Sequence, residues 1–153
     1  MLQQTQVKTV LPYFNNFVKK VPNLKALSSC SEKKVLKLWE GLGYYRRAKN
    51  LHKTSKILIK KYNGKIPNSF LKLKELPGIG NYTANVLLAL IYNQPRIGLD
   101  GNVKRVLFRL LDVNTFNAEN LFKTKRNGDL AEALMEFGAL ICKPKEPKCH
   151  ECK

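Results

Sequence analysis

The chain has 153 residues, of which 44% are hydrophobic and 25% charged, enough to bury one ordinary core or two small lobes. Lysine and arginine number 28 against 11 acidic residues, so the formal charge is +17 and nucleic acid is the first candidate partner. A lysine-rich composition can also reflect the bias of a genome, so the charge alone does not decide the function. Because no apolar run could span a membrane and no signal peptide opens the chain, we expect a soluble, cytoplasmic protein with no membrane partner.

Apolar residues recur at intervals of three or four along most of the chain, which is typical of amphipathic helices. The predicted helices cover residues 2–19, 31–40, 44–62, a few residues after 68, and residues 81–92, 103–111 and 130–141. We expect the first to begin before Met1 and to be kinked or tightened by Pro12, and the helix at 81–92, apolar almost all round, to be enclosed by others. Residues 114–129 have the least regular pattern, and with no alternating strand or repeat the predicted fold class is all-α.

Two glycines precede the predicted helix at 81–92, in the segment Leu-Pro-Gly-Ile-Gly at residues 76–80. A tight turn there exposes backbone N–H groups just ahead of a helix N-terminus, where the helix dipole also favours an anion. Phosphate contacts of this kind position DNA without reading its sequence. The same residues also suit an ordinary helix–helix turn, so Gly78 and Gly80 are candidate phosphate-binding positions that the rest of the chain must decide.

A single aspartate, Asp100, stands at the start of the next predicted helix, in the segment Leu-Asp-Gly-Asn-Val-Lys-Arg at residues 99–105. An aspartate in this place is a good N-cap, and Asp-Gly-Asn is ordinary loop chemistry. The functional interpretation is a carboxylate kept ionised beside a cationic transition state, since a helix N-terminus and neighbouring basic residues favour its charged form.

Three cysteines lie close together near the end of the sequence, at Cys142, Cys149 and Cys152. Crowding of this kind is poor placement for a disulfide framework and good placement for a metal clip, and either zinc or an iron–sulfur cluster suits the residues. Three thiolates require a fourth ligand. The isolated Cys30 is interpreted as a small buried or idle residue.

Five segments taken together resemble the adenine DNA glycosylases of the MutY type. They are Met-Leu-Gln-Gln-Thr-Gln-Val at 1–7, Gly-Leu-Gly-Tyr-Tyr at 41–45, Leu-Pro-Gly-Ile-Gly-Asn-Tyr-Thr-Ala at 76–84, Leu-Asp-Gly-Asn-Val-Lys-Arg at 99–105, and the cysteine spacing. They follow the family's order and span essentially the whole chain. The resemblance implies the helix-hairpin-helix DNA glycosylase fold, a helical bundle with two lobes in a catalytic region at residues 1–141 and a partial iron–sulfur cluster loop at 142–153.

The same resemblance implies base excision repair. Adenine mispaired with 8-oxoguanine or guanine in double-stranded DNA would be flipped out and removed by hydrolysis of its N-glycosidic bond, by a monomeric enzyme that leaves the strand uncut. By the same resemblance, Asp100 is expected to stabilise the oxocarbenium-like sugar and to orient the attacking water. Tyr82 is expected to lie against the sugar, and Asn102 to position water or base.

Further positions match the family's DNA contacts. Gln4 and Tyr44 match the side chains that enter the base stack beside 8-oxoguanine, and Thr5 and Leu2 match their neighbours. Read without the family, Leu2 would be a core residue and Tyr44 a buried tyrosine with a satisfied hydroxyl. Glu132 matches a carboxylate that contacts adenine, and a solvated helix position explains it almost as well.

The sequence also departs from the family pattern. Cys142, Cys149 and Cys152 match three of the four ligands of the family's [4Fe–4S] cluster, and the fourth is expected shortly after them, followed by a domain that recognises 8-oxoguanine. The glutamate that protonates adenine is expected two residues before Met1. We therefore expect a piece cut at both ends, with a helix near residues 114–129 trimmed or lost.

Two alternatives remain at this point. A non-catalytic DNA-binding remnant would explain the charge together with the absent glutamate and fourth cysteine. A glycosylase-lyase similar to endonuclease III would need a Schiff-base lysine in the helix that follows the hairpin, where this chain has Tyr82.

Overall fold

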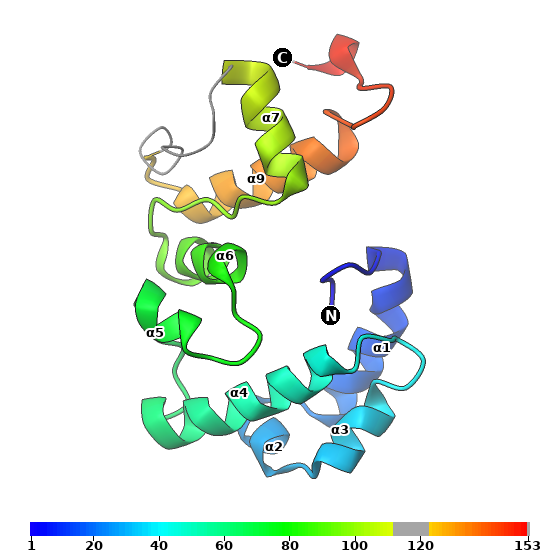
Figure 1. Ribbon diagram of the computed structural model, residues 1–153, viewed down its shortest axis with the longest axis vertical. Helices are drawn as coiled ribbons and strands as arrows, with labels where there is room; N and C mark the ends of the chain where they lie inside the picture. The colour runs from blue at the N-terminus through cyan, green and yellow to red at the C-terminus, as the bar shows by residue number, and fades with distance from the viewer. Residues whose placement is uncertain (112–122, 153) are drawn as a thin grey trace. The chain divides into compact units, whose positions relative to one another are not determined.

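The computed structural model describes residues 1–111 and 123–152 (Figure 1). Every regular element in these ranges is a helix, so the prediction of an all-α fold is confirmed for the described residues. The chain divides into two compact units, the first formed by Met1–Pro67 with Glu75–Gly78 and the second by Asn68–Lys74 with Ile79–Lys153. None of the described helices is both long enough and apolar enough to cross a membrane.

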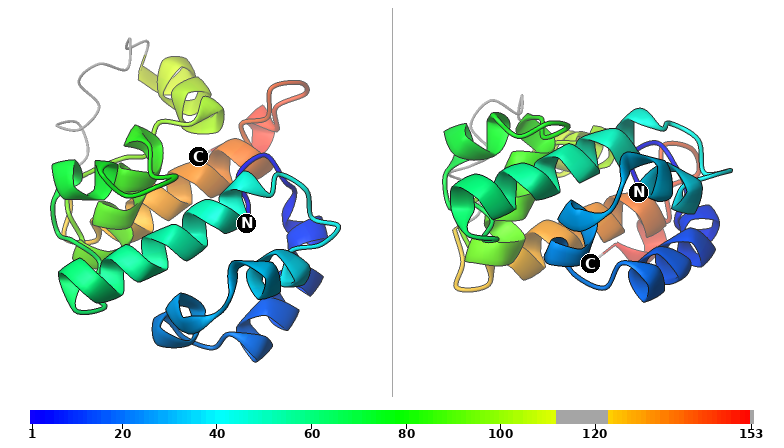
Figure 2. Two further views of the ribbon diagram at one scale, coloured as in Figure 1. Left: turned by 60° about the horizontal axis from the view of Figure 1, so that its bottom comes forward. Right: turned by 90° about the horizontal axis from the view of Figure 1, so that it is seen from below.

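The first unit contains four helices: α1 (Val7–Lys20), α2 (Leu24–Ser29), α3 (Glu32–Leu38) and α4 (Arg46–Tyr62). The long helix α4 packs against α2 and α3, and α1 contacts α3 (Figure 2). The buried core of the unit consists of Val10, Phe17, Val21, Leu27, Val35, Trp39, Leu42 and Ala48. Phe17 and Trp39 meet edge to face at 6.1 Å between ring centroids, which fixes α1 against the end of α3.

Side-chain caps set the helix boundaries in this unit. Ser31 accepts a hydrogen bond from Lys34 N at 3.2 Å at the start of α3, and Asn23 accepts one from Ala26 N at 2.8 Å. The second contact begins α2, a short helix that the sequence pattern did not predict. Asn63 ends α4 in the left-handed conformation, with φ +50°.

The first predicted helix is wrong at its start. It was expected from residue 2 or earlier, and α1 begins only at Val7, because Gln4 takes a left-handed φ of +57° and Thr5 N turns back to Leu2 O at 3.2 Å. The helix does continue through Pro12. Of the seven apolar residues that defined its pattern, two are buried and five are exposed, namely Leu2, Val7, Leu11, Phe14 and Val18.

The buried face of α4 includes polar side chains. The apolar Leu51 is 39% exposed, whereas His52 and Ser55 are both 1% exposed. Each of the two polar side chains has a partner, since His52 Nε2 hydrogen-bonds Cys30 O at 2.9 Å and Ser55 Oγ donates to His52 O at 2.7 Å. The half-buried Cys30 thus contributes its backbone carbonyl to this contact.

The second unit contains α5 (Phe70–Lys74), α6 (Asn81–Tyr92), α7 (Gly101–Leu111), α9 (Asn127–Leu140) and the short 3₁₀ turn η2 (Cys149–Glu151). Helix α9 packs against both α6 and α7, and α5 packs against α6. The core combines Ile97, Val103, Val106, Leu107, Leu134 and Cys142. This packing holds the starts of α6 and α7, which carry the candidate site, on one scaffold.

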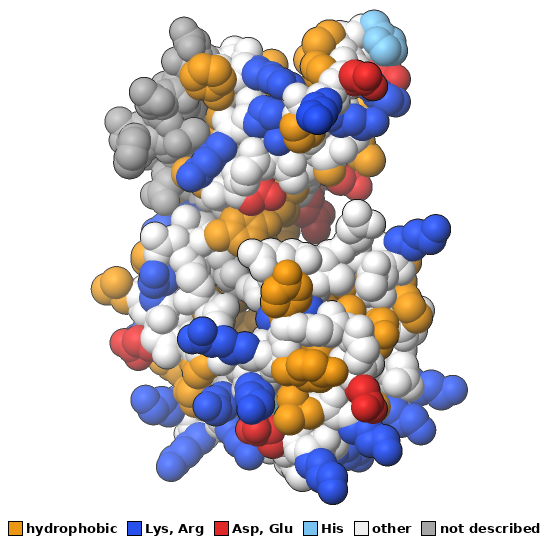
Figure 3. Space-filling view, turned by 45° about the vertical axis from the view of Figure 1, so that its right-hand side comes forward, with side chains coloured by type: hydrophobic (Ala, Val, Ile, Leu, Met, Phe, Trp, Pro, Cys, Tyr) orange, Lys and Arg blue, Asp and Glu red, His pale blue; other side chains and the backbone are white. Residues whose placement is uncertain are grey.

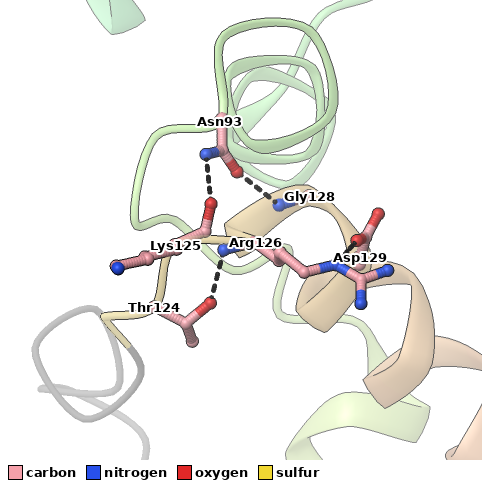
Figure 4. Close-up of polar contacts among 6 residues, drawn as sticks. All are labelled: Asn93, Thr124, Lys125, Arg126, Gly128 and Asp129. Carbon is pink, nitrogen blue, oxygen red and sulfur yellow. Dashed lines mark hydrogen bonds and ion pairs between the residues drawn. The ribbon is translucent and has the colours of Figure 1, made fainter.

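Asn93 joins the end of α6 to the start of α9 (Figure 4). It ends α6 with φ +50°, and its side chain donates to Lys125 O at 2.8 Å and accepts from Gly128 N at 3.2 Å. Asn127, buried at this junction, donates from its side-chain amide to Asn93 O at 2.7 Å. Both ends of the connection are therefore satisfied by asparagine side chains.

Two expectations for this unit differ from the structure, and part of the first falls on residues that the structure does not describe. Most of residues 114–129, predicted to be the least regular part, fall outside the described residues, but Asn127–Leu140 is helical, so α9 begins earlier than predicted. Helix α6 has the predicted bounds but is not enclosed, because Leu90 and Ile91 are 41% and 46% exposed.

Candidate functional site

The glycine turn before α6 is a true hairpin. Gly78 has φ +80°, and a Cβ there would stand 2.9 Å from the Asn50 Cβ, so a larger residue meets both strain and a clash. Thr54 Oγ1 donates to Pro77 O at 3.0 Å, which ties the turn to α4 within the first unit. Both the positive φ and the close approach of Asn50 therefore require glycine at position 78.

Gly80 then forms the N-cap of α6. It is extended (φ −92°, ψ −176°), its carbonyl accepts from Ala84 N at 2.9 Å, and no side chain caps the helix. Lys74 hydrogen-bonds the Asn81 side chain, which brings a positive charge to the same helix end. A helix N-terminus without a side-chain cap and with an adjacent lysine is suited to a phosphate.

Asp100 begins α7 and uses one carboxylate oxygen as its cap. Oδ1 accepts from Val103 N at 2.7 Å, and Asp100 O accepts from Lys104 N at 3.0 Å. The second oxygen, Oδ2, faces Asn102 Nδ2 at 3.5 Å, and the residue is half-buried. The capping interpretation made from the sequence thus holds, and it leaves the second oxygen available for chemistry.

Tyr82, in the first turn of α6, lies within electrostatic reach of this carboxylate. Burial, and then the charge of Asp100, raise the pKa of its phenol above the ordinary value. The hydroxyl donates to Met135 Sδ of α9 at 3.1 Å. The ring also packs on Gly98, where a Cβ would stand 2.9 Å from Tyr82 Cε2 and 2.3 Å from Val86 Cγ2. Gly98 and Met135, neither of which the sequence singled out, thus fix the ring from two sides.

Asn102 is held by α9 and by an arginine of its own helix. A Cβ at Gly138 would stand 2.8 Å from Asn102 Cβ, so the two helices approach closely there because of the glycine. Arg105 Nη2 donates to Asn102 Oδ1 at 2.9 Å and to Gly138 O at 2.7 Å, and its Nε donates to Cys142 O at 2.8 Å. Arg105 thereby orients Asn102 so that its amide nitrogen points to Asp100.

Glu132 is exposed on α9, one turn before Met135, and so lies on the same side of that helix as the Tyr82 contact. The second unit thus brings Tyr82, Asp100 and Asn102 together through a side-chain contact and an electrostatic effect, whereas Glu132 shares only the helix face of Met135. The spacing of three residues from Glu132 is the one sequence signal that could have pointed to Met135 as part of this site.

The remaining DNA-contact candidates lie in the first unit. Gln4 and Tyr44 both have left-handed φ values, +57° and +48°. Tyr44 is 59% exposed and Leu2 is 56% exposed, so neither is the core residue that its type alone would predict. Thr5 Oγ1 accepts from Arg47 Nη1 at 2.9 Å. Arg47 is a residue that the sequence pattern did not single out, although it lies only two residues after the Gly-Leu-Gly-Tyr-Tyr segment.

The three cysteines offer suitable thiol ligands but no assembled site. Cys142 is buried, with Arg109 Nη1 at 3.5 Å from its sulfur, while Cys149 and Cys152 are exposed at the two ends of the η2 turn. Among the described residues no three cysteine, histidine or acidic side chains are grouped so as to hold a metal ion. The described residues therefore fit a cluster in ligand chemistry and not in arrangement.

Basic side chains are abundant on the first unit. Figure 3 shows lysine and arginine side chains gathered over the region of α2, α3 and α4. On α3 alone Lys33, Lys34 and Lys37 are exposed. The excess of positive charge noted in the sequence is thus on the surface, where it favours a polyanion.

The comparisons with known proteins agree with this geometry. Residues 1–128 match the family described as HhH-GPD superfamily base excision DNA repair protein. An adenine DNA glycosylase of Buchnera aphidicola subsp. Baizongia pistaciae is 44% identical over 162 residues, covering 99% of this chain and 46% of that protein. The adenine DNA glycosylase of Homo sapiens is 36% identical over 165 residues, covering 99% and 30%. The chain thus spans about half the length, or less, of the curated relatives that it matches.

Solved structures give the same result. A thermostable thymine-DNA glycosylase superposes with a TM-score of 0.85 at 25% identity, covering 99% of this chain and 75% of that one. A trapped endonuclease III–DNA covalent intermediate gives 0.79 at 26% identity, covering 97% and 74%. Fold and site therefore define an all-α protein of the helix-hairpin-helix class. The chain belongs to the HhH-GPD superfamily of base excision DNA repair proteins.

Proposed function

We propose that the protein is an adenine DNA glycosylase that removes adenine mispaired with 8-oxoguanine or guanine in double-stranded DNA. The observation that carries the proposal is the half-buried Asp100 carboxylate, which uses one oxygen to cap α7 and turns the other toward Asn102. The identity of 36–44% to named adenine DNA glycosylases over 99% of the chain supports the choice of adenine.

In the proposed reaction the bond between the sugar C1′ and adenine N9 breaks, and the electron pair leaves with the protonated base. The cationic sugar that remains is stabilised by the negative charge of Asp100, and a water molecule then adds to C1′ and gives up a proton to yield an abasic site. Asn102, held by Arg105, orients the carboxylate or the water. Tyr82, whose phenol is neutral at physiological pH and whose pKa is raised further by burial and by Asp100, packs against the sugar.

The proposed DNA contacts come from the glycine hairpin, from the first unit and from α9 of the second unit. Gly78 and Gly80 present backbone amides to a phosphate, while Gln4 and Tyr44 enter the base stack. Leu2 and Thr5 flank them, and Glu132 contacts the flipped adenine. The protein acts as a monomer in the cytoplasm, at the nucleoid of a bacterium.

The proposed cofactor is a [4Fe–4S] cluster with Cys142, Cys149 and Cys152 as three of its ligands. Iron and acid-labile sulfide measured in anaerobically purified protein test it. About four irons per chain, lost on substitution of Cys142 by alanine, are expected, whereas iron-free protein with full helical content contradicts the cluster.

The test of the function is a single-turnover assay on duplex DNA with adenine opposite 8-oxoguanine, followed by alkali to reveal abasic sites. It compares this chain with a version extended upstream through the glutamate that the resemblance places two residues before Met1. We expect the extended version to release adenine. Failure of both would favour the non-catalytic DNA-binding protein, and efficient trapping of a Schiff base by borohydride would favour a lyase.

A further inference from the structure

Arg47, near the start of α4, holds the first residues of the chain in a turn. Met1 O, Gln3 O and, at 2.9 Å, Thr5 Oγ1 all lie within hydrogen-bond distance of its Nη1, whose two N–H groups they share. These three acceptors surround Gln4, whose backbone is in the left-handed region. One guanidinium nitrogen therefore fixes the turn on both sides of its strained residue.

The same guanidinium also holds the loop between α3 and α4. Nη2 donates to Gly43 O at 3.3 Å and to Leu42 O at 3.5 Å. The charged group lies over the Tyr44 ring at 5.0 Å and over the Trp39 ring at 5.7 Å. Arg47 thus binds the carbonyl directly before Tyr44 and also lies over the Tyr44 ring, next to a residue with a left-handed backbone.

The contacts of Arg47 depend on the shape of its side chain. The acceptors are backbone carbonyls and one hydroxyl, and the planar guanidinium reaches both the turn at residues 1–5 and the loop between α3 and α4. Its Nε is buried without a hydrogen-bond partner among the described residues. A lysine carries the same charge on one nitrogen and cannot span both the turn and the loop. Because a left-handed backbone is unfavourable for a non-glycine residue, Gln4 and Tyr44 need such support to keep their conformation.

The two supported residues stand on the surface beside exposed apolar groups. Tyr44 and Leu2 are more than half exposed, and Gln4 is exposed as well. Aromatic and apolar side chains held rigidly outward are the kind that insert between base pairs, since each unstacked base then finds a new stacking surface. Inserting them rigidly avoids an ordering cost at the moment of binding.

We propose that Arg47 is a positioning residue that locks the Gln4 turn and the Tyr44 turn into one rigid wedge for the base stack at the mispair. Arg47 acts through these two turns and not as a phosphate contact. The inference rests on the proposed function, because it presupposes that Gln4 and Tyr44 enter the stack.

The test compares Arg47→Lys with the matched control Arg46→Lys, which makes the same change one residue earlier on an exposed side chain. Fluorescence anisotropy at one fixed salt concentration gives the affinities for a duplex with adenine opposite 8-oxoguanine, the adenosine carrying a 2′-fluoro group that resists hydrolysis, and for an undamaged duplex. We expect Arg47→Lys to reduce the ratio of the two affinities about tenfold and to leave undamaged-duplex binding within about twofold, because the charge is kept. Arg46→Lys is expected to match the parent chain.

A double-mutant cycle distinguishes positioning from a general effect on the fold. In a Tyr44→Ala background, adding Arg47→Lys should change the affinity ratio by less than about twofold, since the residue through which Arg47 acts is already gone. A 2-aminopurine placed beside the mispair provides a second signal, which brightens with the parent chain at saturation and stays quenched with Arg47→Lys. If Arg47→Lys loses its helical circular dichroism, Thr5→Val replaces it, because it removes one acceptor of Arg47 and keeps the volume.

Each outcome has a definite meaning. An unchanged affinity ratio in Arg47→Lys, or in Thr5→Val where that variant is used, overturns the proposal, and so does full additivity with Tyr44→Ala. A parent chain that binds both duplexes equally refutes the proposed function and the inference with it. Discrimination by the parent chain that survives Arg47→Lys refutes the inference alone.

Discussion

Asp100 combines a structural and a proposed chemical role, and substitution can separate them. Its Oδ1 accepts from Val103 N at 2.7 Å, a bond that an asparagine side chain makes as well. Asp100→Asn should therefore lose only the attraction of the charge to the helix dipole, about 0.3–1 kcal/mol of the free energy of unfolding. Asp100→Ala should lose the cap in addition, about 1 kcal/mol more.

The expected effect on catalysis is much larger. Removing a group that stabilises charge in a transition state typically costs about 10²–10³ in rate, or about 2.7–4 kcal/mol. Single-turnover adenine release from the upstream-extended protein, together with urea unfolding followed by circular dichroism, measures both quantities. Excision by Asp100→Asn within about tenfold of the parent would refute the charge argument. Equal destabilisation by asparagine and alanine would refute the capping argument.

The pKa of the Tyr82 phenol offers an independent check in the folded protein. Because the charge of Asp100 is the second cause of its raised pKa after burial, Asp100→Asn should lower that pKa while leaving it above its ordinary value. A site-resolved NMR titration of the tyrosines measures it. Glu132→Gln removes a carboxylate that does not contribute to the shift, and the same titration should show no change in that control.

Three further outcomes are expected. Gly138→Ala should destabilise the protein by about 1–3 kcal/mol in urea unfolding, because its Cβ would stand 2.8 Å from Asn102 Cβ. The control Gly101→Ala, whose Cβ would have no atom within 4 Å, should stabilise the protein by about 0.5–1 kcal/mol. A neutral Gly138→Ala would show that α7 and α9 can separate freely. Since the folded pKa of Tyr82 lies above 10.0, its contribution to stability is complete below about pH 10 and is lost as the pH rises through the folded pKa. The difference in unfolding free energy between the parent and Tyr82→Phe should therefore change only above about pH 10. A difference that already changes near neutrality would contradict the raised pKa. The affinity for undamaged duplex should fall linearly with the logarithm of salt concentration; an affinity unchanged between about 50 and 200 mM would contradict phosphate contacts.

Local chemistry determined much of the fold in advance. The bounds of α6, the cap at Ser31 and the left-handed stop at Asn63 follow from residues that act on their own neighbours in sequence. Asp100 as a helix cap belongs with them, because its partner is three residues away. Such contacts are readable from spacing.

Periodicity failed where a distant contact decided the outcome. The apolar pattern continued to Leu2, but the chain turns at Gln4 because Arg47, more than forty residues on, holds two carbonyls before it and the Thr5 hydroxyl after it. The polar buried face of α4 is similar, since His52 is buried only because a carbonyl of another helix end accepts its hydrogen bond. No local pattern encodes either partner.

The candidate site divides in the same way. The sequence alone pointed to the glycine hairpin, to Asp100 and to the cysteine spacing, since each is a short motif with its own chemistry. Only the tertiary structure decided that Gly98 and Met135 fix the Tyr82 ring and that Gly138 admits Asn102 against α9. These contacts join segments tens of residues apart, and their requirement is for space and direction, which a residue type by itself does not carry.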